Sequence, residues 1–87
     1  MSRYHVQTTG AAAKQLRAIT PHQRKRLLRG IATLQDDPRP PGVRKLVGAD
    51  NAWRLRAGDY RVIYEIHDDE LLVLVVKAAH RRDVYRD

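Results

Sequence analysis

Residues 52–67 read AWRLRAGDYRVIYEIH and decide the fold of this chain. Apolar and polar residues alternate on both sides of Gly58-Asp59, a dipeptide that favours a tight turn between two strands. A loop of two residues at this turn places Arg56 directly opposite Arg61. The segment is therefore predicted to form an antiparallel β-hairpin whose two faces differ in chemistry.

One face of this hairpin is apolar and the other is basic. The residues expected to meet the core are Trp53, Leu55, Val62 and Tyr64. The residues expected on the other face are Arg54, Arg56 and Arg61. Like charges that oppose each other across strands destabilise a sheet, and a bound anion would relieve their repulsion. The alternative interpretation is a solvated outer face, with carboxylates such as Glu65 as compensating charges.

A strand and two helices are expected before the hairpin. Residues 3–8 alternate as in a short strand, and a helical pattern begins at Thr9. A second helix is expected to begin at Thr20-Pro21, with Thr20 and Gln23 as a capping box. The apolar positions of the two helices are Ala12, Leu16, Ile19, Leu27, Ile31 and Leu34. The opposite side of the second helix is basic, with His22, Lys25 and Arg29.

The remaining segments complete an α+β fold. Residues 36–42 hold three prolines and a glycine and must be a loop, and residues 44–47 are a candidate short strand. The run 71–76 is continuously apolar, which is typical of a central strand covered on both faces. We expect an N-terminal strand, a helical hairpin and an antiparallel β-meander sheet with both helices packed on one face. With 87 residues, 1–87 is expected to be a single domain.

Composition narrows the possible functions. Seventeen Lys and Arg against ten Asp and Glu give a net charge of +7, which attracts polyanions such as nucleic acids or an acidic protein. The absence of cysteine excludes disulfides, thiolate nucleophiles and Cys-based zinc sites. The four histidines lack metal-ligand spacing, so neither a metal nor another cofactor is expected. No apolar run approaches the roughly 20 residues of a membrane span, and a cytoplasmic location is expected.

A second basic cluster follows the central strand. His80, Arg81 and Arg82 come directly after the expected central strand, with Tyr85 close behind. These side chains could fold back over the arginine face, where arginine would bind phosphate through two hydrogen bonds and tyrosine would stack on a base. The alternative is a frayed basic terminus.

Three segments together resemble the RelE/ParE toxin superfamily. They are Arg44-Lys45-Leu46-Val47-Gly48, residues 53–66, and the ending His80-Arg81-Arg82-Asp83-Val84-Tyr85-Arg86. The resemblance covers essentially the whole chain, including the helical hairpin. It implies a toxin of a type II toxin–antitoxin module, of the RelE type. Such toxins are ribosome-dependent mRNA endoribonucleases that cut in the A site without a metal. The 2′-OH attacks the adjacent phosphate and leaves a 2′,3′-cyclic phosphate and a free 5′-OH.

The resemblance also suggests roles for individual residues. Arg61 and Arg81 would stabilise charge on the phosphate, and Tyr85 would stack on or orient the mRNA base. The candidates for binding RNA phosphates are Lys45, Arg54, Arg56 and Arg82. Arg54 and Arg56 stand where the best-known RelE proteins carry lysines, one of them a proposed base. Since arginine, with a pKa above about 12, is a poor base, His80 or His67 is the candidate for proton transfer.

The expected partners are a cognate antitoxin, acidic in character, and mRNA on the ribosome. Direct DNA binding is not expected without the antitoxin. Two alternatives remain open on the sequence. One is a ParE-like gyrase inhibitor, and the other is a non-catalytic protein that binds RNA or the ribosome.

Overall fold

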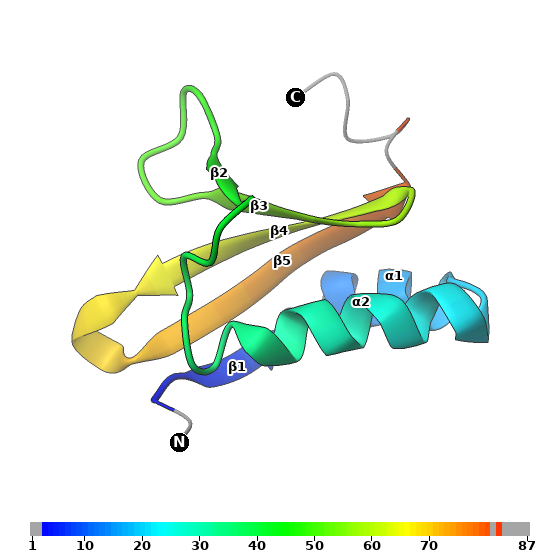
Figure 1. Cartoon of the computed structure of the whole chain (residues 1–87), viewed down its shortest axis with the longest axis horizontal. Coiled ribbons are helices and arrows are strands. Elements are labelled where there is room, and N and C mark those ends of the chain that lie inside the picture. The colour runs from blue at the N-terminus through cyan, green and yellow to red at the C-terminus, as the bar shows by residue number, and fades with distance from the viewer. Residues whose placement is uncertain (1–2, 81, 83–87) are drawn as a thin grey trace.

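Five strands form one sheet, and two helices cover one of its faces, in the computed structural model, which describes residues 3–80 and residue 82 (Figure 1). The α+β fold class predicted from the sequence is confirmed. The elements in chain order are β1 (His5–Thr8), α1 (Gly10–Ala18), α2 (Pro21–Thr33), β2 (Arg44–Lys45), β3 (Trp53–Ala57), β4 (Tyr60–His67), a short 3-10 helix η1 (Asp68–Glu70) and β5 (Leu72–His80).

The sheet is mixed. Its strand order is β1-β5-β4-β3-β2, so β2 to β5 form the expected antiparallel meander. The first strand does not extend this meander. It lies along the outer side of β5 in parallel orientation, with His5 opposite Leu72. Figure 1 shows both helices on the same side of the sheet, which leaves the other side without a helical layer in the described part of the chain.

The β3–β4 hairpin has the register expected from its turn. Leu55 pairs with Val62, and Arg56 pairs with Arg61. Gly58 adopts a φ of +61° in the turn, a conformation that side chains disfavour. The apolar face meets the helices as predicted: Val62 and Tyr64 are fully buried. Trp53 and Leu55 pack against the same core from β3.

The helices are held by their apolar faces and by one side-chain cap. Thr9 caps α1, because its hydroxyl accepts a hydrogen bond from the amide of Ala12 at 3.1 Å. The capping box expected at the start of α2 is wrong, since the Thr20 side chain makes no capping hydrogen bond. The Gln23 amide instead lies buried beside the β3–β4 turn at Gly58. The predicted apolar positions of both helices are buried: Ala12, Leu16, Ile19, Leu27, Ile31 and Leu34.

The fifth strand differs from the expectation that it is covered on both faces. Val73 and Val75 are fully buried beneath the helices. The intervening residues are only half-buried because their side of the sheet carries no helical layer: Leu72, Leu74 and Val76. The continuous apolar run therefore belongs to a strand that one layer of helices covers.

A β-bulge interrupts this strand. Ile63 pairs with Lys77 but Tyr64 pairs with Val75, so Val76 has no partner opposite it in β4. The extra residue reverses the alternation of side chains beyond it. Ala78 consequently returns to the core, where its amide donates a hydrogen bond to Gln15 Oε1 of α1 at 2.8 Å. Lys77 pairs with Ile63, which does not belong to the core cluster beneath the helices.

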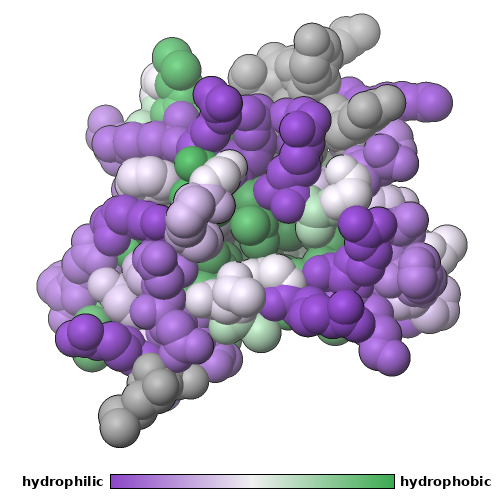
Figure 2. Space-filling view, in the orientation of Figure 1, coloured by the Kyte–Doolittle hydropathy of each residue, from purple (hydrophilic) through white to green (hydrophobic). Residues whose placement is uncertain are grey.

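No helix in residues 3–80 has the length and apolar character needed to cross a membrane. The surface in the view of Figure 2 is mostly hydrophilic, with a small hydrophobic area exposed near its centre.

Candidate functional site

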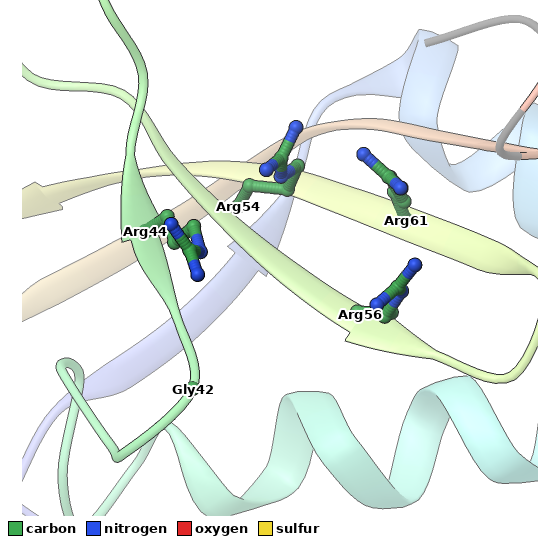
Figure 3. Close-up of a pocket in the computed structure, with 5 residues that line it drawn as sticks. All are labelled: Gly42, Arg44, Arg54, Arg56 and Arg61. Atoms are coloured by element: carbon green, nitrogen blue, oxygen red, sulfur yellow. The ribbon is translucent and has the colours of Figure 1, made fainter. Parts of the chain in front are cut away.

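Four arginines line a hollow on the sheet face that the helices leave open. The hollow has a volume of about 250 Å³ and is bounded by Gly42, Arg44, Arg54, Arg56 and Arg61. We call it the arginine hollow. Figure 3 shows these arginines side by side on β2, β3 and β4. Three adjacent strands therefore bring together cations that lie up to 17 positions apart in the sequence.

The strand register places these arginines in two opposed pairs. Arg44 of β2 lies opposite Arg54 of β3, and Arg56 of β3 lies opposite Arg61 of β4. Like charges in such positions repel each other and reduce the stability of a sheet. An anion held among the guanidinium groups would turn this repulsion into attraction, so the arrangement favours a negatively charged ligand.

Arg61 is the most enclosed of the four, with 8% of its surface exposed. Arg54 is half-buried, whereas Arg44 and Arg56 are exposed. A cation in a poorly hydrated wall interacts more strongly with an anion than one surrounded by water. Arg61 therefore supplies the strongest local attraction at the inner end of the arginine hollow.

Glu65, the carboxylate considered as a compensating charge for these arginines, contacts a histidine instead. Glu65 lies 2.9 Å from the ring of His67, farther along β4. Within the described part of the chain, no carboxylate forms an ion pair with Arg44, Arg54 or Arg56. These three positive charges remain available to a ligand.

The wall that carries Gly42 and Arg44 is anchored by a buried tyrosine. The hydroxyl of Tyr64 donates a hydrogen bond to the carbonyl of Pro38 at 2.8 Å. Burial raises the pKa of Tyr64 to about 12, so the hydroxyl remains a donor well above neutral pH. This contact fixes the proline-rich loop to the centre of the sheet, just before the loop enters β2.

A second set of hydrogen bonds, at the protein surface, holds the same loop in place. Asp68 accepts two hydrogen bonds from Arg39, at 2.8 and 3.2 Å, and one from the Tyr4 hydroxyl at 2.6 Å. These donors, Arg39 foremost, lower the pKa of Asp68 to about 2. The Arg39 guanidinium also lies 5.2 Å from the centre of the Trp53 ring, within range of a cation–π contact.

The structure brings together three of the predicted site residues and separates others. Arg54, Arg56 and Arg61 line the arginine hollow. Lys45 does not, because strand alternation turns it to the other side, where its Nζ lies 5.9 Å from the Trp53 ring. Arg44, which we did not single out as a site residue, takes the corresponding place. The sequence signals only a candidate short strand at residues 44–47, and the pairing with β3 shows which of its residues faces the hollow.

The C-terminal candidates are partly outside the described residues. Arg81 and Tyr85 both lie outside them. The His80 ring stands edge-on to Tyr60 at 5.3 Å, on the sheet face that meets the helices and opposite the arginine hollow. Arg82 is exposed, and its amide lies 3.4 Å from His80 Nδ1. Among residues 3–80 and 82, no three His, Asp or Glu side chains are grouped as in a metal site.

Comparison with known proteins places this geometry in a family. The family model for the ParE toxin of the type II toxin–antitoxin system, parDE, matches residues 6–85. A protein of Methanocaldococcus jannaschii assigned as toxin RelE1 is 26% identical over 88 residues, which cover 98% of each chain.

Solved structures of RelE proteins share the fold. The archaeal RelE–RelB complex from Pyrococcus horikoshii OT3 contains a chain with a TM-score of 0.80 and 28% identity, over 91% of this chain and 96% of that one. A chain of the intact E. coli RelBE toxin–antitoxin complex has a TM-score of 0.78 and 24% identity, over 88% of this chain and 95% of that one. At the latter identity, the likeness concerns the fold alone.

Proposed function

The chain belongs to the RelE/ParE superfamily of toxins from type II toxin–antitoxin systems, and we propose that it acts as a ribosome-dependent endoribonuclease that cuts mRNA in the A site. The observation that carries the proposal is the arginine hollow, in which four cations surround a space of about 250 Å³. Guanidinium groups bind phosphate oxygens through paired hydrogen bonds. A phosphodiester of RNA is the anion that this site would hold.

Cleavage of the phosphodiester depends on stabilising the negative charge that develops on the phosphate. The 2′-oxygen of one nucleotide attacks the adjacent phosphorus, and the bond from phosphorus to the 5′-oxygen breaks. The products are a 2′,3′-cyclic phosphate and a free 5′-OH. Negative charge grows on the phosphate oxygens during this step, and fixed cations aimed at those oxygens lower the barrier. Arg61 would make the strongest such contact, because its surroundings exclude most water.

None of the four arginines of the hollow is assigned a role in proton transfer. The 2′-hydroxyl must release a proton and the leaving 5′-oxygen must gain one, but arginine remains protonated at any physiological pH. His67 lies six residues from Arg61 on β4 and bonds to Glu65, while His80 stands on the opposite face beside Tyr60. The proposal therefore assigns proton transfer to solvent, and the rate acceleration to clustered charge and in-line alignment of the 2′-oxygen.

The C-terminal residues retain the roles that the family resemblance implies. In this proposal Arg81 adds a second cation at the scissile phosphate, and Tyr85 stacks on the mRNA base. Arg82 contacts a flanking phosphate, whereas Lys45 lies on the other side of the sheet and is not assigned a phosphate. An acidic antitoxin holds the toxin inactive by covering its basic surface, with rapid and salt-sensitive association. The site of action is the cytoplasm, where ribosomes translate.

Mapping of transcript ends tests this function. Purified protein is added to translating ribosomes with a defined mRNA, and the ends are located by primer extension. We expect A-site cuts with 2′,3′-cyclic phosphate ends, and a loss of roughly 100-fold in cleavage rate for Arg61→Ala, as when one transition-state donor is removed. Arg29→Ala, on the exposed side of α2, is the matched control and should cut normally. Uncut mRNA in all reactions would reject the proposal.

The ParE description of the matching family model favours a second candidate, a gyrase inhibitor without ribonuclease activity. The same purified protein would then block supercoiling by gyrase and leave mRNA intact. Measuring both reactions with one preparation separates the two candidates.

A further inference from the structure

The loop between β2 and β3 forms a second hollow beside the arginine hollow. Its volume is about 380 Å³, and its lining residues are Leu46, Val47, Gly48, Ala49 and Arg54. Arg54 lines both hollows, so they meet at its side chain. Figure 1 shows this loop projecting from the sheet on the side away from the helices. A ligand in the arginine hollow could therefore extend into the loop without crossing the core.

The two ends of the loop are held in place by the sheet. Arg44 pairs with Arg54, and the amide of Leu46 donates a hydrogen bond to the carbonyl of Ala52 at 2.8 Å. The Asn51 side chain bonds to the backbone of Ile66, as a neighbouring strand would. Its Nδ2 donates to the Ile66 carbonyl at 2.6 Å, and its Oδ1 accepts from the Ile66 amide at 3.3 Å. These hydrogen bonds fix the backbone that carries the hollow, and a fixed site loses less entropy on binding.

The chemistry of this hollow suits a flat, uncharged and largely apolar group. Its lining is aliphatic apart from Arg54, and Val47 is fully exposed. The core gains nothing from a valine in that position. A guanidinium group can hold a phosphate with its edge while its face stacks on an aromatic ring. Arg54 lines both hollows, so its side chain could bind a phosphate in one and stack on an aromatic ring in the other.

We propose that the loop hollow is a nucleobase subsite, occupied by the base of a nucleotide whose phosphate lies in the arginine hollow. This inference rests on the proposed function, because it requires RNA as the ligand. Asn51 is committed to Ile66, so no side chain of the lining offers hydrogen bonds for the edge of a base other than Arg54. The subsite therefore accepts any of the four bases with little discrimination.

Short oligonucleotides test the subsite. The probes are two trinucleotides of uridine with 2′-O-methyl groups, which block cleavage, one intact and one without its central base. Affinities are measured by fluorescence anisotropy for the wild-type chain and for a Leu46→Ala/Val47→Ala double variant. The wild type should bind the intact probe roughly fivefold to tenfold more tightly than the abasic probe, as expected for one stacked base. In the double variant this ratio should fall below about twofold, with abasic binding unchanged.

Two control variants make the outcome decisive. Leu28→Ala removes an exposed leucine from α2, away from both hollows, and should keep the wild-type ratio. Arg56→Ala should weaken both probes equally, because it alters only the arginine hollow. Equal binding of the two probes by the wild type, or the same ratio in the double variant, overturns the subsite and leaves the proposed function standing. Failure of the intact probe to bind at all also overturns the subsite, whereas the proposed function is tested separately by cleavage on translating ribosomes.

Discussion

Arg56 and Arg61 lie directly opposite each other across β3 and β4, on the sheet face that no described helix covers. Two guanidinium groups in opposed positions repel, so their pairing disfavours the sheet. Hydrophobic burial on the other face of the same strands, at Val62 and Tyr64, outweighs this repulsion. The hairpin therefore forms although its open face carries two opposed cations.

Neutralising one member of this pair should stabilise the protein. We expect Arg56→Gln to raise the free energy of unfolding by about 0.5 kcal/mol at low salt, the scale of one cross-strand like-charge contact. The gain should shrink in about 1 M salt, where screening acts over roughly 3 Å. Urea unfolding at both salt concentrations measures it. Arg29→Gln on α2 is the control and should change stability little; lower stability of the Arg56 variant would contradict the prediction.

The same substitution should weaken RNA binding and reduce its dependence on salt. Four phosphate contacts give a slope of log K against log salt near −3, and loss of one contact should reduce its magnitude by about 0.7. The measurement is a titration of single-stranded RNA at several salt concentrations. An unchanged slope in Arg56→Gln would place the phosphates elsewhere on the surface.

Removal of the Tyr64 hydroxyl should destabilise the fold. Tyr64→Phe keeps the ring in the core but leaves the buried Pro38 carbonyl without its donor. An unsatisfied buried acceptor costs about 1–2 kcal/mol. Chemical unfolding checks this value. Tyr60→Phe removes a hydroxyl that makes no hydrogen bond within the described residues and should cost far less. A similar loss in both variants would contradict the special role of the Pro38 contact.

Stability should fall in acid because of Asp68. Its pKa is lowered from 3.8 to about 2 in the folded state, so it holds fewer protons there than in the unfolded chain. The stability it supplies is present above pH 3.8 and is lost as pH falls toward about 2. Asp68→Asn should therefore flatten the stability profile between these pH values. Asp69→Asn, at the exposed neighbouring position, should leave the profile as in wild type.

We expect glycine to be the only residue that is well tolerated at position 58, in the turn between β3 and β4. Gly58 has a φ of +61°, and a Cβ there would lie 3.2 Å from Arg26 Nη1. We expect Gly58→Ala to cost about 1–2 kcal/mol, mainly from the left-handed backbone. Thermal unfolding measures the loss. Gly10→Ala at the start of α1 meets nothing within 4 Å and should be neutral or stabilising; equal losses in the two variants would contradict the prediction.

The sequence predicted the elements whose signals are local. Gly58-Asp59 between alternating segments was sufficient for the hairpin and its register, and that register placed Arg54, Arg56 and Arg61 on one face. The apolar spacing of the two helices was equally sufficient for their buried faces. Each of these inferences depends only on residues that are close in the chain.

The remaining features depend on distant contacts. Arg44 enters the hollow because a two-residue strand pairs with β3 across a loop, and nothing within residues 44–47 specifies that register. His80 faces Tyr60 because a bulge at Val76 shifts the strand by one residue. An uninterrupted apolar run conceals such a shift, since it has no alternation to break. The same run suggested burial on both faces, although one helical layer covers the strand.

The bulge at Val76 also limits how this chain can vary in length. A strand that is one residue out of step can be restored only by another change of one residue nearby. The projecting loop at residues 46–50 is different, because the hydrogen bonds at its base close it off from the sheet. Insertions between homologues should therefore accumulate in that loop. Single-residue gaps within β5 should be rare, because an alignment that places one there turns Ala78 and His80 to the wrong side of the sheet.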